Sequence, residues 1–149
     1  MTMKQRISIK QVEPKAYEVL YVMEEYLSAT DLSVQLRELI KIRVSQINKC
    51  AYCLEKHTKD ARKAGETEQR IYALSAWEES PLFTDEERAV FALTDEVTKI
   101  SEHGVKNTTF QNVQTYFTDK KVAQIIMAIN HMNFLNRIAI STKMFNPVI

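Results

Sequence analysis

Apolar residues recur at intervals of three and four along most of the chain, which is the spacing of one face of an α-helix. Only 2 Gly and 3 Pro occur, so few residues are available for the many turns of a β protein. The pattern predicts an all-α fold, and the length of 149 residues predicts one domain over 1–149.

Capping signals place the ends of the predicted helices. Pro14 suits a first helical turn, Asp31 can cap the following helix, and Gly65 suits a helix end. Thr84 and Glu87 form a capping box, T-x-x-E. We expect residues 1–12 to be a loose arm or a short edge segment and residues 75–83 to be a loop. The predicted helices cover 14–28, 31–47, 50–64, 67–74, 84–101, 108–117 and 118–143.

Composition and charge exclude several classes of function. The formal net charge is +1, so the chain lacks the field of one sign with which a protein holds nucleic acid. The longest purely apolar run is 125–129, far shorter than the ~20 residues that span a bilayer. The N-terminus lacks the apolar region of a signal peptide. We therefore expect a cytoplasmic protein that binds neither nucleic acid nor a membrane.

Both cysteines of the chain, Cys50 and Cys53, lie in the predicted helix 50–64. In a reducing compartment so close a pair is typical of redox or metal chemistry rather than of a structural cross-link. Successive residues of an α-helix are rotated by about 100°, so Cys50, Cys53 and His57 fall on one face of this helix. Tyr52 falls among the charged residues of the opposite face. We expect the two thiols and the imidazole to face the interior and Tyr52 to face solvent.

Position along the helices gives each of these groups its chemistry. The helix N-terminus at Cys50 favours a thiolate, while His57, four residues after Cys53, favours Cys53 as the attacking thiol. Two sulfurs one turn apart can also close a disulfide. Glu38 falls near the level of His57 if the preceding helix runs back antiparallel, although the helical pattern alone indicates a solvated residue. Facing inward, Glu38 would orient His57, which would then take the proton of Cys53.

Two other interpretations of the cysteine pair stay open. The pair can be structural, or its spacing a coincidence. It can also belong to a zinc site in which His57 is the third ligand and the fourth is Glu38, His103 or His131. A structural zinc site usually draws on two well-separated pairs of ligands, and a thioredoxin-like site needs a βαβ context; the sequence has neither. We therefore favour redox chemistry without a bound metal or cofactor.

The last predicted helix is apolar nearly all round, which implies burial on several sides. One polar stripe interrupts it, formed by Asn130, Asn133, Arg137 and Ser141. Buried polar groups need partners, which can lie in the core, in the active site or in another subunit. We expect a subunit contact here.

Glu38 is followed by eleven residues, by the motif Cys50-x-x-Cys53, by three more residues and then by His57. This spacing resembles the signature of the alkylhydroperoxidase D (AhpD)-like group. That group belongs to the carboxymuconolactone decarboxylase superfamily. The resemblance covers roughly residues 15–145, including 37–39, 57–62, 65–66, 80–84 and 136–137. The four-residue signature is specific, whereas C-x-x-C by itself would not be.

The resemblance implies a helical bundle built around an antiparallel helix pair that carries the C-x-x-C motif. It also implies thiol-dependent reduction of hydroperoxides, with Cys53 attacking, Cys50 resolving, and His57 and Glu38 relaying protons. An external dithiol, free or carried on a partner protein, would be the reductant, and the assembly would be a homo-oligomer, a trimer or hexamer. Relatives can carry a histidine where this chain has Tyr52.

Two other functions compete with a peroxidase or dithiol–disulfide reductase. One is a lyase acting on a small lactone or carboxylic acid, with His57 and Glu38 as acid and base. The other is a non-enzymatic redox sensor in which the cysteine pair is the switch. The lyase would keep its activity after both thiols are alkylated, and the sensor would be oxidised stoichiometrically without turnover.

Overall fold

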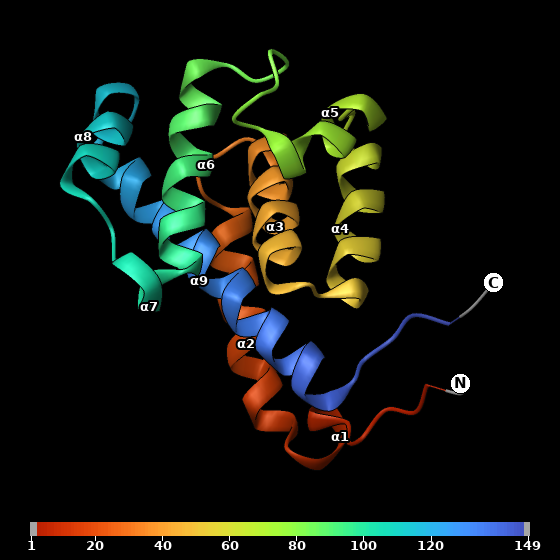
Figure 1. Cartoon of the computed structure of the whole chain (residues 1–149). Helices are drawn as coiled ribbons and strands as arrows, with labels where there is room; N and C mark the ends of the chain where they lie inside the picture. The colour runs from red at the N-terminus through yellow and green to blue at the C-terminus, as the bar shows by residue number, and fades with distance from the viewer. Residues whose placement is uncertain (1–2, 148–149) are drawn as a thin grey trace.

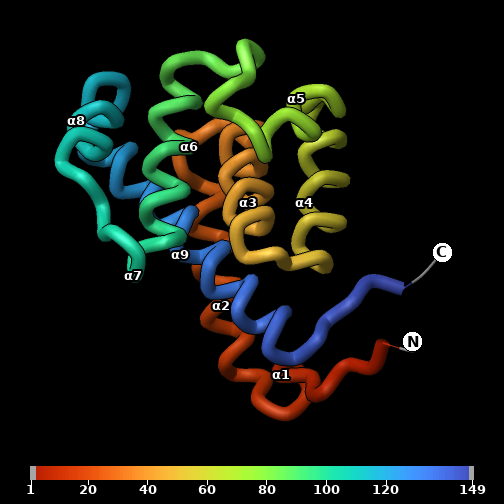
Figure 2. The backbone as a smooth tube through the Cα atoms, viewed as in Figure 1, coloured from red at the N-terminus to blue at the C-terminus, as the bar shows by residue number. Residues whose placement is uncertain are grey.

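The computed structural model describes residues 3–147. The helix α3 (Val34–Asn48) lies at the centre of the protein. The helix α4 (Ala51–Lys63) runs antiparallel along one side of it, and α6 (Asp85–Thr98) lies along the other (Figures 1 and 2). The long helix α9 (Asp119–Thr142) crosses α3 and also packs against α2 (Pro14–Ser28). All regular elements within residues 3–147 are helical, so the predicted all-α fold is confirmed.

The shorter elements connect these helices. One of them, α7, ends at Gly104, whose φ of +65° is a conformation that glycine adopts readily. They are α1 (Ile9–Val12), α5 (Glu68–Ala73), the 3₁₀-helix η1 (Leu74–Ala76), α7 (Ile100–His103) and α8 (Asn107–Tyr116).

Most of the predicted boundaries agree with the structure to within one or two residues, and three differ. Ser33, not Asp31, caps α3, because its hydroxyl accepts the Leu36 N–H one turn into the helix. The predicted helix 84–101 breaks after Thr98, so its end forms the separate turn α7. The segment 1–12, predicted as a loose arm or a short edge segment, forms a single helical turn at α1 within residues 3–12, and residues 1–2 lie outside the described part of the chain. The capping box of Thr84 and Glu87 is present as predicted.

Two apolar clusters lie on opposite sides of α3. Ile40 and Val44 join the larger cluster, which includes both cysteines and much of α6 and α9. Leu39 and Ile42 join the smaller one beneath α5 and η1, where Trp77 also packs. Because α3 is covered on both sides, polar residues along it are also buried. This burial decides the environment of the candidate site.

Asparagines connect α3 to α9 inside the protein. The Asn48 amide donates to the side-chain oxygens of Asn133 and Asn136, at 2.9 and 3.0 Å. The Asn136 amide in turn donates to the Ser45 hydroxyl at 3.1 Å. Asn133 therefore finds its partners within the chain, and the expected subunit contact is wrong for this residue. It stays a prediction for the exposed Asn130, Arg137 and Ser141.

The two ends of the described chain lie side by side. The Arg6 N–H donates to the carbonyl of Thr142 at 2.9 Å, so the N-terminal segment follows the end of α9. Within residues 3–147, none of the helices combines the length and the apolar character needed to cross a bilayer.

A partly buried ion pair holds α3 to α6 and gives a test of this packing. The Arg43 guanidinium binds the Asp95 carboxylate through two hydrogen bonds, of 2.6 and 2.7 Å, and the Trp77 indole donates to the same carboxylate. We expect Arg43→Ala to lower the free energy of unfolding by about 1–3 kcal/mol, because it leaves Asp95 without its charged partner. Urea unfolding measures this loss.

The matched control for Arg43→Ala is Lys59→Ala, which removes the exposed ion pair with Glu55 on α4. Exposed pairs contribute only about 0.2–1 kcal/mol, so this variant should unfold close to the parent. Equal unfolding midpoints for the two variants would contradict the role given to Arg43.

Candidate functional site

The two cysteines lie at the start of α4, just after a sharp turn from α3. Lys49 ends α3 in a left-handed conformation, φ 58°, and Cys50 is extended and becomes the N-cap of α4. A disulfide joins Cys50 to Cys53, whose Cα atoms are 5.3 Å apart. The two side chains are 1% and 3% exposed. The expectation that both sulfurs face the interior is confirmed.

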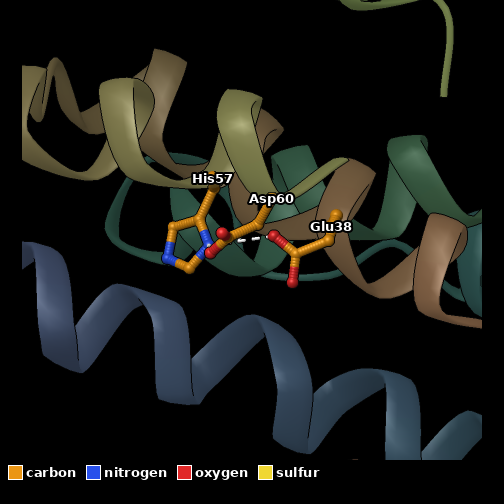
Figure 3. Close-up of side chains that lie close together, drawn as sticks. All are labelled: Glu38, His57 and Asp60. Carbon is orange, nitrogen blue, oxygen red and sulfur yellow. Dashed lines mark hydrogen bonds and ion pairs between the residues drawn. The ribbon is translucent and has the colours of Figure 1, made fainter. Parts of the chain in front are cut away.

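Glu38 reaches from α3 to the imidazole of His57 on α4. Its Oε2 lies 2.9 Å from His57 Nδ1, and both side chains are buried (Figure 3). The interpretation of Glu38 as a solvated residue is therefore wrong, because α3 is enclosed by its neighbours on both sides. A neutral His57 that donates its Nδ1 proton to this carboxylate keeps an unprotonated Nε2, the form that can accept a proton from a thiol.

Lys41 completes the surroundings of Glu38. Its ammonium donates to Glu38 Oε1 at 3.0 Å and to Glu24 Oε1, on α2, at 3.3 Å. Burial raises the pKa of the Glu38 carboxyl, but the His57 hydrogen bond and the Lys41 charge outweigh it, so that pKa lies below its usual value. Glu38 is therefore held as a carboxylate.

A second histidine is bound in the same way on the far side of Lys41. His131, on α9, lies with Nε2 3.0 Å from Glu24 Oε2. This hydrogen bond lowers the pKa of Glu24 to about 2, helped by the charge of Lys41 and opposed by partial burial. Glu24 is therefore ionised throughout the physiological range.

A cavity of about 400 Å³ opens between α2, α3, α4 and α9, and these groups surround it. Among residues 3–147, its lining includes Cys53 and His57 but not Cys50. Tyr52 also lines it and is half-buried, so the expectation that Tyr52 faces solvent is wrong. The helix projection missed this contact because α9 and the segment after it cover that side of the first turn of α4. The remaining lining is mostly apolar or aromatic, including Tyr17, Leu20, Tyr21, Met132, Leu135, Ile138 and Met144.

The donor atoms of Glu38, His57 and Asp60 lie within 4.8 Å of one another, close enough to consider a cation site (Figure 3). Glu38 already accepts hydrogen bonds from His57 and Lys41, and the ammonium would repel a cation. The other predicted zinc set needs two thiolates, which the disulfide form does not provide. The arrangement suits proton exchange better than metal binding. His103, offered as a zinc ligand, is exposed at the end of α7.

Sequence reasoning missed Lys41 and Glu24 as members of this site. The spacing of three residues between Glu38 and Lys41 was a usable signal, since such a pair shares one face of a helix. Glu24 gave no signal, because nothing in the pattern shows that α2 lies against α3 and α9 at this point. His131 was considered only as a packing residue or a zinc ligand.

Known proteins resemble this chain in sequence. A sequence model described as the Carboxymuconolactone decarboxylase family matches residues 14–96. YdfG, an uncharacterized protein of Bacillus subtilis (strain 168), is 40% identical over 139 residues, which cover 93% of this chain and 95% of that protein.

Two solved structures share the fold. A protein of unknown function from Agrobacterium tumefaciens, described as a candidate antioxidant defence protein AhpD, is 37% identical with a TM-score of 0.95, covering 98% of this chain and 100% of that one. An uncharacterized peroxidase-related protein from Silicibacter is 24% identical with a TM-score of 0.81, covering 91% of this chain and 72% of that one. At that identity the second likeness shows the fold alone.

The low pKa of Glu24 predicts how the stability of the protein depends on acid. Its folded-state pKa of about 2 lies below the usual value of 4.5, so ionised Glu24 stabilises the fold above pH 4.5. That contribution is lost as the pH falls from 4.5 toward 2. In Glu24→Gln, the free energy of unfolding should therefore fall less steeply over this range than in the parent.

Urea unfolding at a series of pH values measures the slope. Glu25→Gln removes the exposed neighbouring carboxylate and is the matched control, expected to keep the slope of the parent. A parental slope in Glu24→Gln would show that the ion pair with Lys41 and His131 does not stabilise the fold.

Proposed function

The chain belongs to the carboxymuconolactone decarboxylase family as an AhpD-like member, and on this premise we propose that it is a thiol-dependent hydroperoxide reductase. The observation that supports this most directly is that Cys53 and His57 line one cavity, with the Glu38 carboxylate bound to Nδ1 of the imidazole. A nucleophile, a base and a group that orients the base are the parts that covalent catalysis by a thiol requires. The family match and the likeness to the AhpD-like protein of Agrobacterium tumefaciens support a redox role at the level of the family.

The cavity favours Cys53 as the thiol that attacks, a choice that the sequence left open. In the reduced protein, His57 takes the proton of the Cys53 thiol, and the thiolate attacks one oxygen of the hydroperoxide. The O–O bond breaks, giving a sulfenic acid on Cys53 and an alcohol. The Cys50 thiol, buried behind it, then displaces water from the sulfenic acid and forms the Cys50–Cys53 disulfide.

An external dithiol would restore the two thiols by disulfide exchange. Because Cys53 lines the cavity and Cys50 does not, the incoming thiol is expected to attack Cys53 and release Cys50. The dithiol can be a small molecule or a group carried on a partner protein. We also propose that the protein acts in the cytoplasm as a homo-oligomer, a trimer or hexamer, as the family resemblance implies.

The lyase and sensor alternatives differ from this proposal in measurable ways. A lyase would keep turning over its lactone or acid after both thiols are alkylated, since only His57 and Glu38 would do chemistry. A sensor would consume one equivalent of peroxide and then stop, even with a dithiol present. Sustained peroxide consumption that alkylation abolishes would exclude both.

The two cysteines are expected to behave differently when each is replaced. Cys50→Ser should still react with one equivalent of hydroperoxide and accumulate a sulfenic acid on Cys53, but it should not form the intramolecular disulfide or turn over. Cys53→Ser should lose the peroxide reaction, because the remaining thiol lies behind the cavity wall. Mass spectrometry after one equivalent of peroxide, with a sulfenic acid trap, measures both outcomes. Turnover of Cys53→Ser at the parental rate would disprove the mechanism.

Glu38→Gln tests the role of the carboxylate. The amide oxygen can still accept the His57 hydrogen bond, but it no longer stabilises a protonated imidazole. We expect sulfenic acid formation to slow by on the order of 10²-fold. The rate constant comes from stopped-flow mixing of reduced protein with hydroperoxide. Glu79→Gln, which neutralises an exposed carboxylate in a loop, is the control and should match the parent.

A further inference from the structure

One continuous chain of charged groups joins His57 to a second histidine on the same cavity. From His57 the chain runs through Glu38 (2.9 Å), Lys41 (3.0 Å) and Glu24 (3.3 Å) to His131 (3.0 Å). All five side chains line the cavity. The mechanism proposed above uses only the His57 end, so the pair of His131 and Glu24 has no role in it.

The charges of the two carboxylates and the ammonium in this chain do not cancel. Glu24 and Glu38 share the single ammonium of Lys41, so these three groups carry one net negative charge, which can stabilise positive charge that forms on either imidazole during the reaction. The other charged side chains of the cavity, Lys56 and Asp60, bind each other at 3.0 Å and add no net charge. Apart from the Cys53 thiol of the reduced protein, the remaining ionisable groups of the lining are the hydroxyls of Tyr17, Tyr21 and Tyr52.

The reduction itself needs a second proton at a second place. When the Cys53 thiolate takes one oxygen of the hydroperoxide, the other oxygen leaves as an alkoxide, a strong base that needs a proton. Displacement at oxygen proceeds with the attacking atom, the attacked oxygen and the leaving oxygen in line. The leaving oxygen therefore lies on the side of the attacked oxygen away from Cys53, where the other helices form the cavity wall.

We propose that His131, held by Glu24, is the general acid that protonates this leaving oxygen. The proposal rests on the peroxidase function proposed above and adds a catalytic residue to it. Nε2 of His131 is bound to Glu24, and within residues 3–147 no protein group is bound to Nδ1, so one nitrogen is available to a substrate. His131 comes from α9, whereas Cys53 and His57 come from α4, so the cavity is lined by acid–base groups on two different helices.

The proton balance closes without changing the charge of the site. His57 gains the proton of Cys53, and His131 loses one to the alkoxide, so the charge of the five-group chain is the same before and after. Cys53 ends as a sulfenic acid and the substrate as a neutral alcohol. The next step, condensation of Cys50 with the sulfenic acid, releases water and needs no net proton.

The identity of the leaving group provides the sharpest test. tert-Butyl hydroperoxide releases a strongly basic alkoxide, whereas peracetic acid releases acetate, which needs no proton. We expect reduced His131→Gln to react with tert-butyl hydroperoxide on the order of 10²-fold more slowly than the parent, and with peracetic acid at close to the parental rate. Stopped-flow measurement of Cys53 oxidation gives both rate constants for the full-length protein. His103→Gln, which changes an exposed histidine on α7, should match the parent with both oxidants.

Each other outcome has a distinct meaning. An equal loss with both oxidants would show that His131 only maintains the structure of the site, and no loss with either would show that it takes no part; both overturn the inference. If His131→Gln does not fold, Glu24→Gln decides by the same comparison, with a smaller loss expected for tert-butyl hydroperoxide alone. If neither oxidant oxidises Cys53 of the reduced parent protein, the proposed function itself is refuted.

Discussion

A carboxylate can be buried at Glu38 only because an imidazole and an ammonium are bound to it. That requirement determines much of the site. It places His57 of α4 against α3, and it draws in Lys41, whose remaining hydrogen bond brings Glu24 of α2 to the same point. Removing one partner would leave an uncompensated charge inside the protein, so these helices are held together by electrostatics as well as by their apolar faces.

The two cysteines differ in environment although they are only three residues apart. The N-cap position of Cys50 turns its sulfur toward the backbone, where it accepts the Cys53 N–H at 3.4 Å, while Cys53 lines the cavity. Asn48, just before this turn, is bound to two asparagines of α9. The asparagine contacts therefore hold the start of α4 in place against α9. In the proposed mechanism, this turn lets the Cys53 sulfur meet the substrate while the Cys50 sulfur waits to form the disulfide.

Most of the fold could be predicted from local signals. Three signals each involve only a few neighbouring residues, so they can be recognised in the sequence alone. They are the capping box at Thr84, the glycine after α4 and the spacing of apolar residues. Positions that were predicted wrongly, such as Tyr52 and Asn133, depend on contacts with residues that are far away in the sequence. Tyr52 is half-buried because α9 and the segment after it cover it, and Asn133 is satisfied by a residue 85 positions away.

The sequence by itself determined the helical class, the pairing of Cys50 with Cys53, and the family signature that adds His57 and Glu38. The helical class and the shared helix face of the two cysteines follow from periodicity and spacing, and the part played by Glu38 was implied only by the family resemblance; none of these needs knowledge of the packing. Only the tertiary structure decided that Glu38 is buried, that Cys53 rather than Cys50 lines the cavity, and that Glu24, Lys41 and His131 join the same set of charges. The physical reason is that burial and charge pairing depend on which helices meet, and four separate helices supply these groups.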